Sequence, residues 1–517
     1  MDALEIYAAA LAEYRNKNYE KALEILEEFN KIAPNWSKAI LLEAYIHRDQ
    51  KLYLSEISAL EKFFKVTDIE QEKILAADVY SLLGSALRNL GNSKAAVNCF
   101  INSARLEEKP TAICTEISNA IFAANDVENF TAEDFKNLYA EYQKNLACIQ
   151  PFEKKTYNHK KLRVGYLSAD FKEHPVMFWA SALIFESNKN LFEVYCYSAG
   201  KIFDAVTEQI KNSVEGWRDI SDLSDFDAAK LIRSDEIDIL FDFSGHTSNN
   251  RLPIMAYRPA AVQISGIGYM NSTGLNCVDY FLSDEICSEH FSAIQNFFTE
   301  NIICMTHSHF CYTPLKKMPA PKIAPSISKG YVTFGCFNNF SKITDSMLAA
   351  WKKILDAVPN SKLILKHRIF DTVECRNFVS TRLQNLGIEI SRVELRGFSA
   401  DYLEQYGEID IALDTFPYNG GITTCEALYM GVPVISLYGD RHGTRFGLSI
   451  LKNIGLDEFA VPNFEEYIKR AVALANDKNL LQILRKNLRA IMENSPLMNT
   501  KEYVQELEEF YIAACEN

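Results

Sequence analysis

Apolar residues change their spacing once along this chain of 517 residues. Up to about residue 145 they recur every three or four positions, which predicts amphipathic helices and almost no strand. From residue 162 onward, short apolar runs alternate with helical stretches, which predicts strands and helices in turn. The polar and basic stretch QPFEKKTYNHKK, at 150–161, lies between the two patterns and indicates a domain boundary.

The alternating region contains two series of predicted strands. The first series lies at 162–168, 192–198, 237–243, 261–267 and 280–282. The second lies at 331–337, 361–366, 392–398, 409–415 and 433–439. Residues 287–330 are less regular and proline-rich, so we interpret them as a linker. Alternation of this kind is typical of doubly wound sheets, and it predicts two Rossmann-like α/β domains that face a cleft. The predicted domains are 1–148, 160–315 and 328–517, the last with amphipathic closing helices.

The stretch 409–447 (IDIALDTFPYNGGITTCEALYMGVPVISLYGDRHGTRFG) predicts a strand, a glycine loop, a short helix and a second parallel strand. This arrangement leaves the loop and the helix N-terminus at the carboxyl edge of the sheet, where ligands bind. Gly420 and Gly421 allow close approach of the backbone, and Thr423 and Thr424 offer hydroxyls beside free N–H groups that suit a phosphate. Glu426 is placed to close a capping box with Thr423 or to bind a ribose. An ordinary capped crossover fits the local pattern equally well.

The helical region has the composition of tetratricopeptide repeats. Ala22 and Ala95 lie 73 residues apart, close to two periods of 34 residues. The residues that indicate two repeat units are Tyr19, Ala22 and Pro34, then Tyr80, Gly84, Ala95, Phe100, Ala104 and Pro110. Stacked repeats form a concave surface that can hold a peptide, so we expect a protein or peptide acceptor there. A packed cap on the following domain is the alternative.

Charge and cysteine usage narrow the class of protein. The net charge of −14 argues against nucleic acid as the main partner. The acidic N-terminus and the lack of a long apolar run predict a cytoplasmic protein without a membrane span. The cluster Cys304, His307, His309 and Cys311 matches no standard zinc spacing, so we expect no metal site.

Four motifs in order carry a more specific signal. They are LRVGYLSADFKEHPV, FGCFNNFSKI, LDTFPYNGGITTCEALYMGVP and NSPLMNTKEYVQELEEFY. Together they resemble the protein O-GlcNAc transferase and SPINDLY family, glycosyltransferase family 41, over about residues 162–514 with tetratricopeptide-like helices in front. The resemblance implies a GT-B fold and a nucleotide-sugar donor in the cleft. It also implies inverting transfer to protein side chains without a metal or other cofactor.

The resemblance assigns roles to individual residues. Lys342 in FNNFSKI matches the family's diphosphate-binding lysine, with Asn339 beside it in nucleotide-sugar binding. His174 matches a histidine on the acceptor side of the cleft, and His246 follows a neighbouring strand. Either imidazole could take the acceptor proton or hold the sugar, since it titrates near neutral pH. The further candidates for the base are Asp170 and Asp242.

Departures from the animal O-GlcNAc transferase pattern leave the donor open. Gly421 stands where a donor-binding histidine is expected, and Ser399 and Tyr402 replace a lysine and a histidine near the base and ribose. Tyr402 can still stack on a base. His442, at the same predicted sheet edge, is a candidate for diphosphate or sugar binding.

The sequence therefore predicts transfer of a sugar, GlcNAc from UDP-GlcNAc first, to Ser or Thr of a protein. Three alternatives remain at this point. The chain could be an asparagine glucosyltransferase that uses UDP-glucose, a SPINDLY-like fucosyltransferase that uses GDP-fucose, or a tetratricopeptide adaptor without activity.

Overall fold

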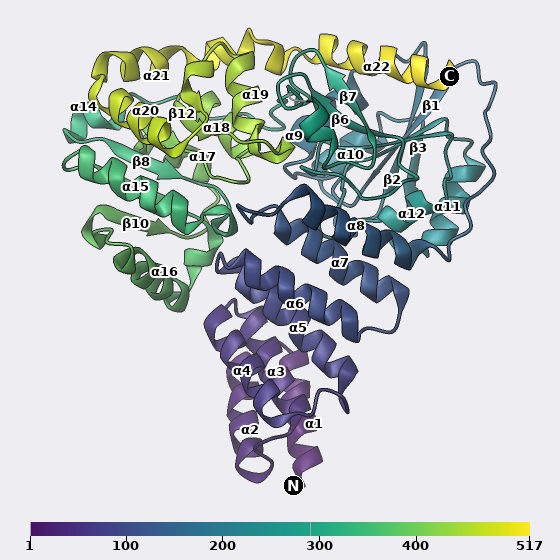
Figure 1. Cartoon of the computed structure of the whole chain (residues 1–517), viewed down its shortest axis with the longest axis vertical. Helices are drawn as coiled ribbons and strands as arrows, with labels where there is room; N and C mark the ends of the chain where they lie inside the picture. Colours follow the sequence, from purple (N-terminus) through teal and green to yellow (C-terminus); the bar gives the residue numbers. More distant parts are fainter. Residues whose placement is uncertain (1, 290, 517) are drawn as a thin grey trace.

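The computed structural model describes residues 2–289 and 291–516, and it has eight N-terminal helices followed by two parallel sheets with helices around them (Figure 1). The N-terminal helices are α1 (Ala3–Arg15), α2 (Tyr19–Ile32), α3 (Ser37–Asp49), α4 (Tyr53–Val66), α5 (Lys73–Asn89), α6 (Ser93–Leu106), α7 (Pro110–Ala124) and α8 (Ala132–Leu146). Consecutive helices pack against each other, as expected for stacked helical repeats. The predicted helical region is therefore confirmed.

The first sheet has seven strands in the order β3-β2-β1-β4-β5-β6-β7, and all its neighbours are parallel. Its elements are β1 (Leu162–Ser168), α9 (Met177–Phe185), β2 (Phe192–Ser198), α10 (Ala205–Lys211), β3 (Gly216–Asp219), α11 (Asp225–Ser234), β4 (Ile239–Asp242), α12 (Leu252–Ala256), β5 (Val262–Ser265), β6 (Tyr280–Asp284), α13 (Phe291–Gln295) and β7 (Asn301–Met305). The strand order reverses between β1 and β4, which makes that pair the switch point of a doubly wound sheet.

The second sheet repeats this topology in the order β10-β9-β8-β11-β12-β13. Its elements are α14 (Pro325–Lys329), β8 (Thr333–Cys336), η1 (Phe340–Lys342), α15 (Asp345–Ala357), β9 (Lys362–Lys366), η2 (Arg368–Asp371), α16 (Val373–Asn385), η3 (Ile390–Arg392), β10 (Val393–Arg396), α17 (Tyr402–Gln405), η4 (Tyr406–Glu408), β11 (Ile411–Leu413), α18 (Ile422–Tyr429), β12 (Val434–Leu437), η5 (His442–Thr444), α19 (Phe446–Asn453), η6 (Asp457–Phe459) and β13 (Ala460–Val461). Its switch point lies between β8 and β11. Two Rossmann-like sheets in sequence confirm the predicted fold class.

The closing helices are α20 (Phe464–Asn476), α21 (Lys478–Glu493) and α22 (Thr500–Glu516), with η7 (Pro496–Met498) between the last two. Figure 1 shows α22 crossing from the second sheet's side of the molecule to the first. There the Tyr503 hydroxyl donates to the His309 carbonyl at 2.9 Å, and Glu508 accepts from Asn188 N at 2.8 Å. The chain end therefore fastens the two Rossmann-like domains to each other.

The interpretation of 287–330 as an irregular linker is wrong in part. Strand β7 lies within it and pairs along its full length with β6. Its residues NIICM alternate only weakly between exposed and buried positions, because β7 is the edge strand of the sheet. The short strands β3 and β13 were likewise not predicted.

The helical repeats contact both Rossmann-like domains. Helix α4 reaches α16, where Glu374 accepts hydrogen bonds from the backbone N–H groups of Leu54 and Ser55 at 3.1 and 3.0 Å. Helix α7 lies against the first domain, where Asn125 Nδ2 donates to the Tyr269 hydroxyl at 3.0 Å. The helical region therefore forms a third wall around the space between the two sheets.

Candidate active site

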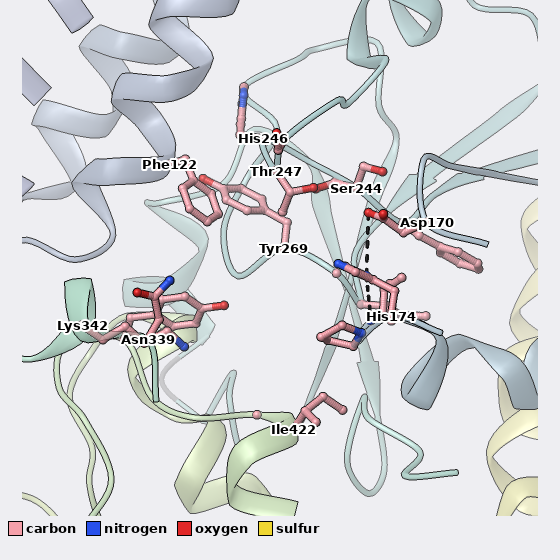
Figure 2. Close-up of a pocket in the computed structure, with 18 of the residues that line it drawn as sticks. Phe122, Asp170, His174, Ser244, His246, Thr247, Tyr269, Asn339, Lys342 and Ile422 are labelled. Carbon is pink, nitrogen blue, oxygen red and sulfur yellow. Dashed lines mark hydrogen bonds and ion pairs between the residues drawn. The ribbon is translucent and has the colours of Figure 1, made fainter. Parts of the chain in front are cut away.

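A cavity of about 600 Å³ lies where the switch points of the two sheets face each other. Each sheet contributes the loops that follow its central pair of strands, at the edge where α/β folds bind ligands. The residues that line the cavity include Asp170, His174, Trp179, Ser244, His246 and Tyr269 from the first domain, Asn338, Asn339, Lys342, Tyr418, Gly421, Ile422 and Thr423 from the second, and Arg88, Asn119 and Phe122 from the helices. Figure 2 shows Lys342 and Asn339 on one side of the cavity and His174 and Asp170 on the other.

Lys342 ends the 3-10 turn η1 that follows β8, so its side chain starts at the sheet edge. Its Nζ lies 3.3 Å from the ring centre of Tyr418 and donates to the Asn419 carbonyl at 3.0 Å. Burial lowers the pKa of Lys342 to about 8, although Asp126 and Asp414 act in the opposite direction. A partly buried cation in the cavity wall interacts more strongly with an anion that enters the cavity than a fully solvated cation would.

The N-terminus of α18 lies at the same sheet edge, with Gly421 as its N-cap residue. The Thr423 hydroxyl donates to Asn338 Oδ1 at 2.8 Å, and the Thr424 hydroxyl donates back to the Gly420 carbonyl at 3.0 Å. A Cβ on Gly420 would lie 2.6 Å from Thr423 Oγ1, so only glycine fits this turn. Thr423 and Gly421 line the cavity, while Thr424 is buried behind them.

Asp414 organises this loop, and sequence reasoning missed it. Its carboxylate accepts from Gly420 N at 2.7 Å, Thr415 N at 2.8 Å and the Ser436 hydroxyl at 2.7 Å. Full burial still raises its pKa to about 6, because desolvation outweighs these hydrogen bonds. The available signal was its position directly after a buried strand, where α/β folds place functional side chains.

The expected capping box between Thr423 and Glu426 does not form. Glu426 is buried and accepts a hydrogen bond from the Tyr402 hydroxyl, and burial raises the pKa of Glu426 to about 7. The hydrogen bond with Tyr402 of α17 therefore takes the place of the expected capping box with Thr423. Neither Glu426 nor Tyr402 belongs to the residues that line the cavity.

His174 stands across the cavity from Lys342, in the loop that follows β1 (Figure 2). Its Nδ1 lies 3.7 Å from Asp170 Oδ2, and it also accepts from Val176 N at 3.4 Å. Burial lowers the pKa of His174 below its usual value, so the ring is neutral at pH 7. A neutral imidazole beside a carboxylate can accept a proton and be stabilised once it is charged.

His246 also borders the cavity, but both of its ring nitrogens are engaged. Nε2 lies 2.9 Å from the Thr273 carbonyl and therefore carries the proton, which leaves Nδ1 to accept from the Ser118 hydroxyl at 2.8 Å. Burial lowers its pKa to about 4. This geometry argues against the predicted role as a base and makes His246 a link between α7 and the first Rossmann-like domain.

His442 lies outside the cavity. It is 2 % exposed, and its Nδ1 lies 3.2 Å from the Met270 carbonyl. Burial lowers its pKa to about 3. The expectation that it meets a diphosphate or sugar followed from its place in the sequence, but η5 turns the ring towards the first domain.

The helical repeats contribute a cation that the sequence did not indicate. Arg88 of α5 forms an ion pair with Asp126 at 3.0 Å, and its guanidinium also reaches the Ser341 hydroxyl at 3.4 Å. The guanidinium lies 4.4 Å from the ring centre of Phe122. Because η1 carries both Ser341 and Lys342, the repeats contact the segment that positions the cavity lysine.

Cys304, His307, His309 and Cys311 do not come together as one cluster. Cys304 is exposed, His307 lies 3.8 Å from Glu502, and Cys311 and His309 are buried. Of these four, only His309 belongs to the one Cys/His group that converges in the described part of the chain, with Cys287 and His442.

Two Rossmann-like domains that face a cleft define the GT-B class of nucleotide-sugar-dependent transferases, and comparison with known proteins places the chain more narrowly. The profile described as "Glycosyl transferase family 41" matches residues 142–320 and 324–507, and the chain belongs to that family. A second profile, "Fis1 C-terminal tetratricopeptide repeat", matches residues 5–51 and agrees with the predicted repeats.

The chain is similar to plant proteins over its transferase region. It is 38% identical over 359 residues to "Probable UDP-N-acetylglucosamine--peptide N-acetylglucosaminyltransferase SPINDLY" of Petunia hybrida, which covers 68% of this chain and 38% of that protein. It is 30% identical over 365 residues to the protein named SEC of Arabidopsis thaliana, and this match covers 68% of this chain and 37% of that protein. The chain therefore spans less than two fifths of the length of these relatives.

The structure is similar to that of a mutant of the Thermobaculum terrenum O-GlcNAc transferase. The TM-score is 0.85 at 27% sequence identity, and the match covers 99% of this chain and 98% of that one. The helical region and both Rossmann-like domains therefore share one arrangement in the two proteins. No helix in the described part of this chain is both long and apolar enough to cross a bilayer.

Proposed function

We propose that this protein transfers GlcNAc from UDP-GlcNAc to Ser or Thr side chains of a protein, with inversion at the anomeric carbon and without a metal ion in the reaction. The proposal rests on the position of Lys342 and the N-terminus of α18, which lie at the same edge of the cavity. The family, the similarity to an O-GlcNAc transferase and the GlcNAc transferase names of the plant relatives support the choice of sugar.

The leaving group binds on the side of the second domain. A diphosphate that departs from the sugar gains negative charge, and Lys342 supplies the opposite charge from within the cavity. The first-turn N–H groups beside Thr423 add the positive end of the helix dipole. These groups take the place of the divalent cation that a carboxylate pair would otherwise hold.

The acceptor enters on the side of the first domain, where His174 lies (Figure 2). Its hydroxyl oxygen attacks the anomeric carbon, the bond from that carbon to the diphosphate oxygen breaks, and the hydroxyl proton passes to Nδ1 of the neutral His174 ring, the nitrogen that carries the lone pair. Asp170, 3.7 Å from His174 Nδ1, stabilises the imidazolium that forms. Attack opposite to the leaving group inverts the configuration.

The helical repeats recruit the protein acceptor in this proposal. They form one wall of the cavity through Arg88, Asn119 and Phe122, so a polypeptide that reaches the sugar must pass them. The network of Arg88, Asp126 and Ser341 connects this wall with the turn that carries Lys342.

The test is transfer to peptide libraries that offer either Ser and Thr or Asn as the only acceptors. We expect a mass increase of one N-acetylhexosamine on the Ser/Thr library, lost on mild β-elimination, and a β-linked product by NMR. Modification restricted to the Asn library would contradict the proposal in favour of an asparagine glycosyltransferase. Binding of the donor without transfer to either library would favour an inactive adaptor.

A further inference from the structure

Three metal-ligating side chains converge in the interior, outside the catalytic cavity. Cys287 follows β6, His309 follows β7, and His442 lies in η5 of the second domain. One ligand atom of each lies within 4.8 Å of those of the other two, and the residues are 0, 1 and 2 % exposed. Residues from the two Rossmann-like domains thus place one sulfur and two nitrogen donors close together.

Hydrogen bonds fix the tautomers of both histidines. The Nδ1 of His309 is bonded to the Asp284 carboxylate, and the Nδ1 of His442 lies 3.2 Å from the Met270 carbonyl. Both Nδ1 atoms therefore carry the proton, and both Nε2 atoms keep a free lone pair. In metal sites a ligating histidine almost always donates its other N–H to a carboxylate or a carbonyl in this way.

His442 Nε2 has no hydrogen-bond partner among the described residues, although it is completely buried. A buried nitrogen lone pair without a partner destabilises a fold, so an unmet acceptor here points to an occupant. A cation that accepts electron pairs from two imidazoles and one thiolate supplies the partner that His442 Nε2 lacks. It also takes the place of the hydrogen bonds of the Cys287 thiol with Asp284 and Ser449.

We propose that Cys287, His309 and His442 bind one Zn²⁺ ion, which joins the two Rossmann-like domains. Zinc favours nitrogen and sulfur ligands in tetrahedral geometry, and three protein ligands leave the fourth position to a water molecule. Ligand atoms around zinc lie roughly 3.5 Å apart, so shifts of about an ångström close the shell. Binding breaks the S–H bond of Cys287, releases one proton to solvent and changes no oxidation state.

The position of the site makes its role structural. Cys287 and His309 belong to the first domain and His442 to the second, so the ion would fix one domain against the other. The His309 ring packs at 3.9 Å, between ring centres, on Phe310, and Phe310 lines the catalytic cavity. The ion would thus lie behind the cavity wall and take no part in glycosyl transfer.

A single water molecule is the competing occupant. A cavity of about 10 Å³ beside His442 and Met270 has room for one. A water would leave the protein without bound metal and without a metal–thiolate spectrum, which separates the two possibilities.

The experiment uses the full chain, purified from cells grown with added zinc, dialysed without chelator and analysed for metal by mass spectrometry. A second sample, stripped and refilled with Co²⁺, is read by its thiolate-to-cobalt absorption band. The variants are Cys287→Ala and His442→Ala, and the matched control is Cys196→Ala, which removes an equally buried thiol from β2. Circular dichroism checks the fold of each protein.

We expect one zinc per chain in the wild type and in Cys196→Ala, at least a tenfold lower content in both cluster variants, and no cobalt–thiolate band in Cys287→Ala. Added Zn²⁺ should raise the melting temperature of the stripped wild type and not that of Cys287→Ala. A wild type that binds no stoichiometric zinc and shows no cobalt–thiolate band overturns the proposal, whether or not the variants fold.

Discussion

Replacing Lys342 by methionine should separate catalysis from stability. In the proposed mechanism Lys342 stabilises the departing diphosphate, so its removal takes away one stabilising charge of the transition state. Loss of one such group typically lowers kcat by about 100-fold or more. The side chain of methionine keeps most of the apolar stem of lysine, but it loses the cation–π contact of Nζ with the Tyr418 ring.

The same substitution should not destabilise the fold. The fall of the Lys342 pKa from 10.5 to about 8 corresponds to about 3 kcal/mol of unfavourable burial, and the contact of the side chain with the cavity reduces this to about 2 kcal/mol. The lost hydrogen bond to the Asn419 carbonyl and the lost contact of Nζ with the Tyr418 ring together oppose that gain by about 2 kcal/mol. We therefore expect Lys342→Met to be as stable as the wild type at pH 7, with a melting temperature within a few degrees.

The pH dependence of this difference has a definite sign. The folded pKa of Lys342 is depressed, so between pH 8 and 10.5 the unfolded chain binds more protons and the wild type gains stability as pH rises. The stability of Lys342→Met relative to the wild type should thus be highest below pH 8 and fall as the pH rises towards about 10.5.

The assays are single-turnover transfer and urea unfolding at pH 7 and pH 10. The matched control is Lys352→Met, on the same domain at a partly exposed position paired with Asp356. It should keep full activity. Near wild-type transfer by a folded Lys342→Met protein would remove Lys342 from the mechanism.

Four further outcomes follow from the structure. Transfer should persist in EDTA without added metal, measured by product mass, and activity that returns only with Mg²⁺ or Mn²⁺ would contradict the lysine-based site. Gly420→Ala should lower kcat/KM for the donor by about 100-fold, because the added Cβ would lie 2.6 Å from Thr423 Oγ1. Gly421→Ala should have a smaller effect, because its Cβ would meet only Trp179, at 3.5 Å, and equal effects of the two variants would refute the steric argument. Charge reversals at exposed repeat positions, Lys94→Glu and Arg105→Glu, should raise the acceptor KM several-fold and spare donor hydrolysis, and unchanged acceptor kinetics would leave the repeats as a structural cap. The pKa of His246 is depressed in the folded state, so its contribution to folding stability is complete above about pH 6.5 and is lost as the pH falls towards 4. Over that range, urea unfolding should show a loss of stability about 3 kcal/mol smaller in His246→Gln than in the wild type, and parallel curves would argue against a buried neutral ring.

Strong periodicity made much of the fold predictable. Helix α15 (Asp345–Ala357) is an example of a clear signal, because a threonine cap precedes it and its apolar face is continuous. The central strands of both sheets were predicted for the same reason. The edge strands β3, β7 and β13 were not, since they are short or half exposed and lack a clear pattern.

The site was predictable only where it depends on local structure. Lys342 and Thr423 lie in the segments that follow the neighbouring strands β8 and β11, so their meeting at one sheet edge could be expected from the topology alone. The partnership of Glu426 with Tyr402, the place of His442 and the entry of Arg88 depend on contacts between distant segments. No pattern within a single stretch of sequence contains that information.

The choice of donor tests the central claim most directly. Wild type and Lys342→Met should be incubated separately with UDP-GlcNAc, UDP-glucose and GDP-fucose, and scored for nucleoside diphosphate release and for transfer to a Ser/Thr peptide library. We predict release and transfer from UDP-GlcNAc by the wild type, with at least about 100-fold less by Lys342→Met. Turnover of GDP-fucose or UDP-glucose in its place, or equal turnover by the two proteins, would contradict the proposed function.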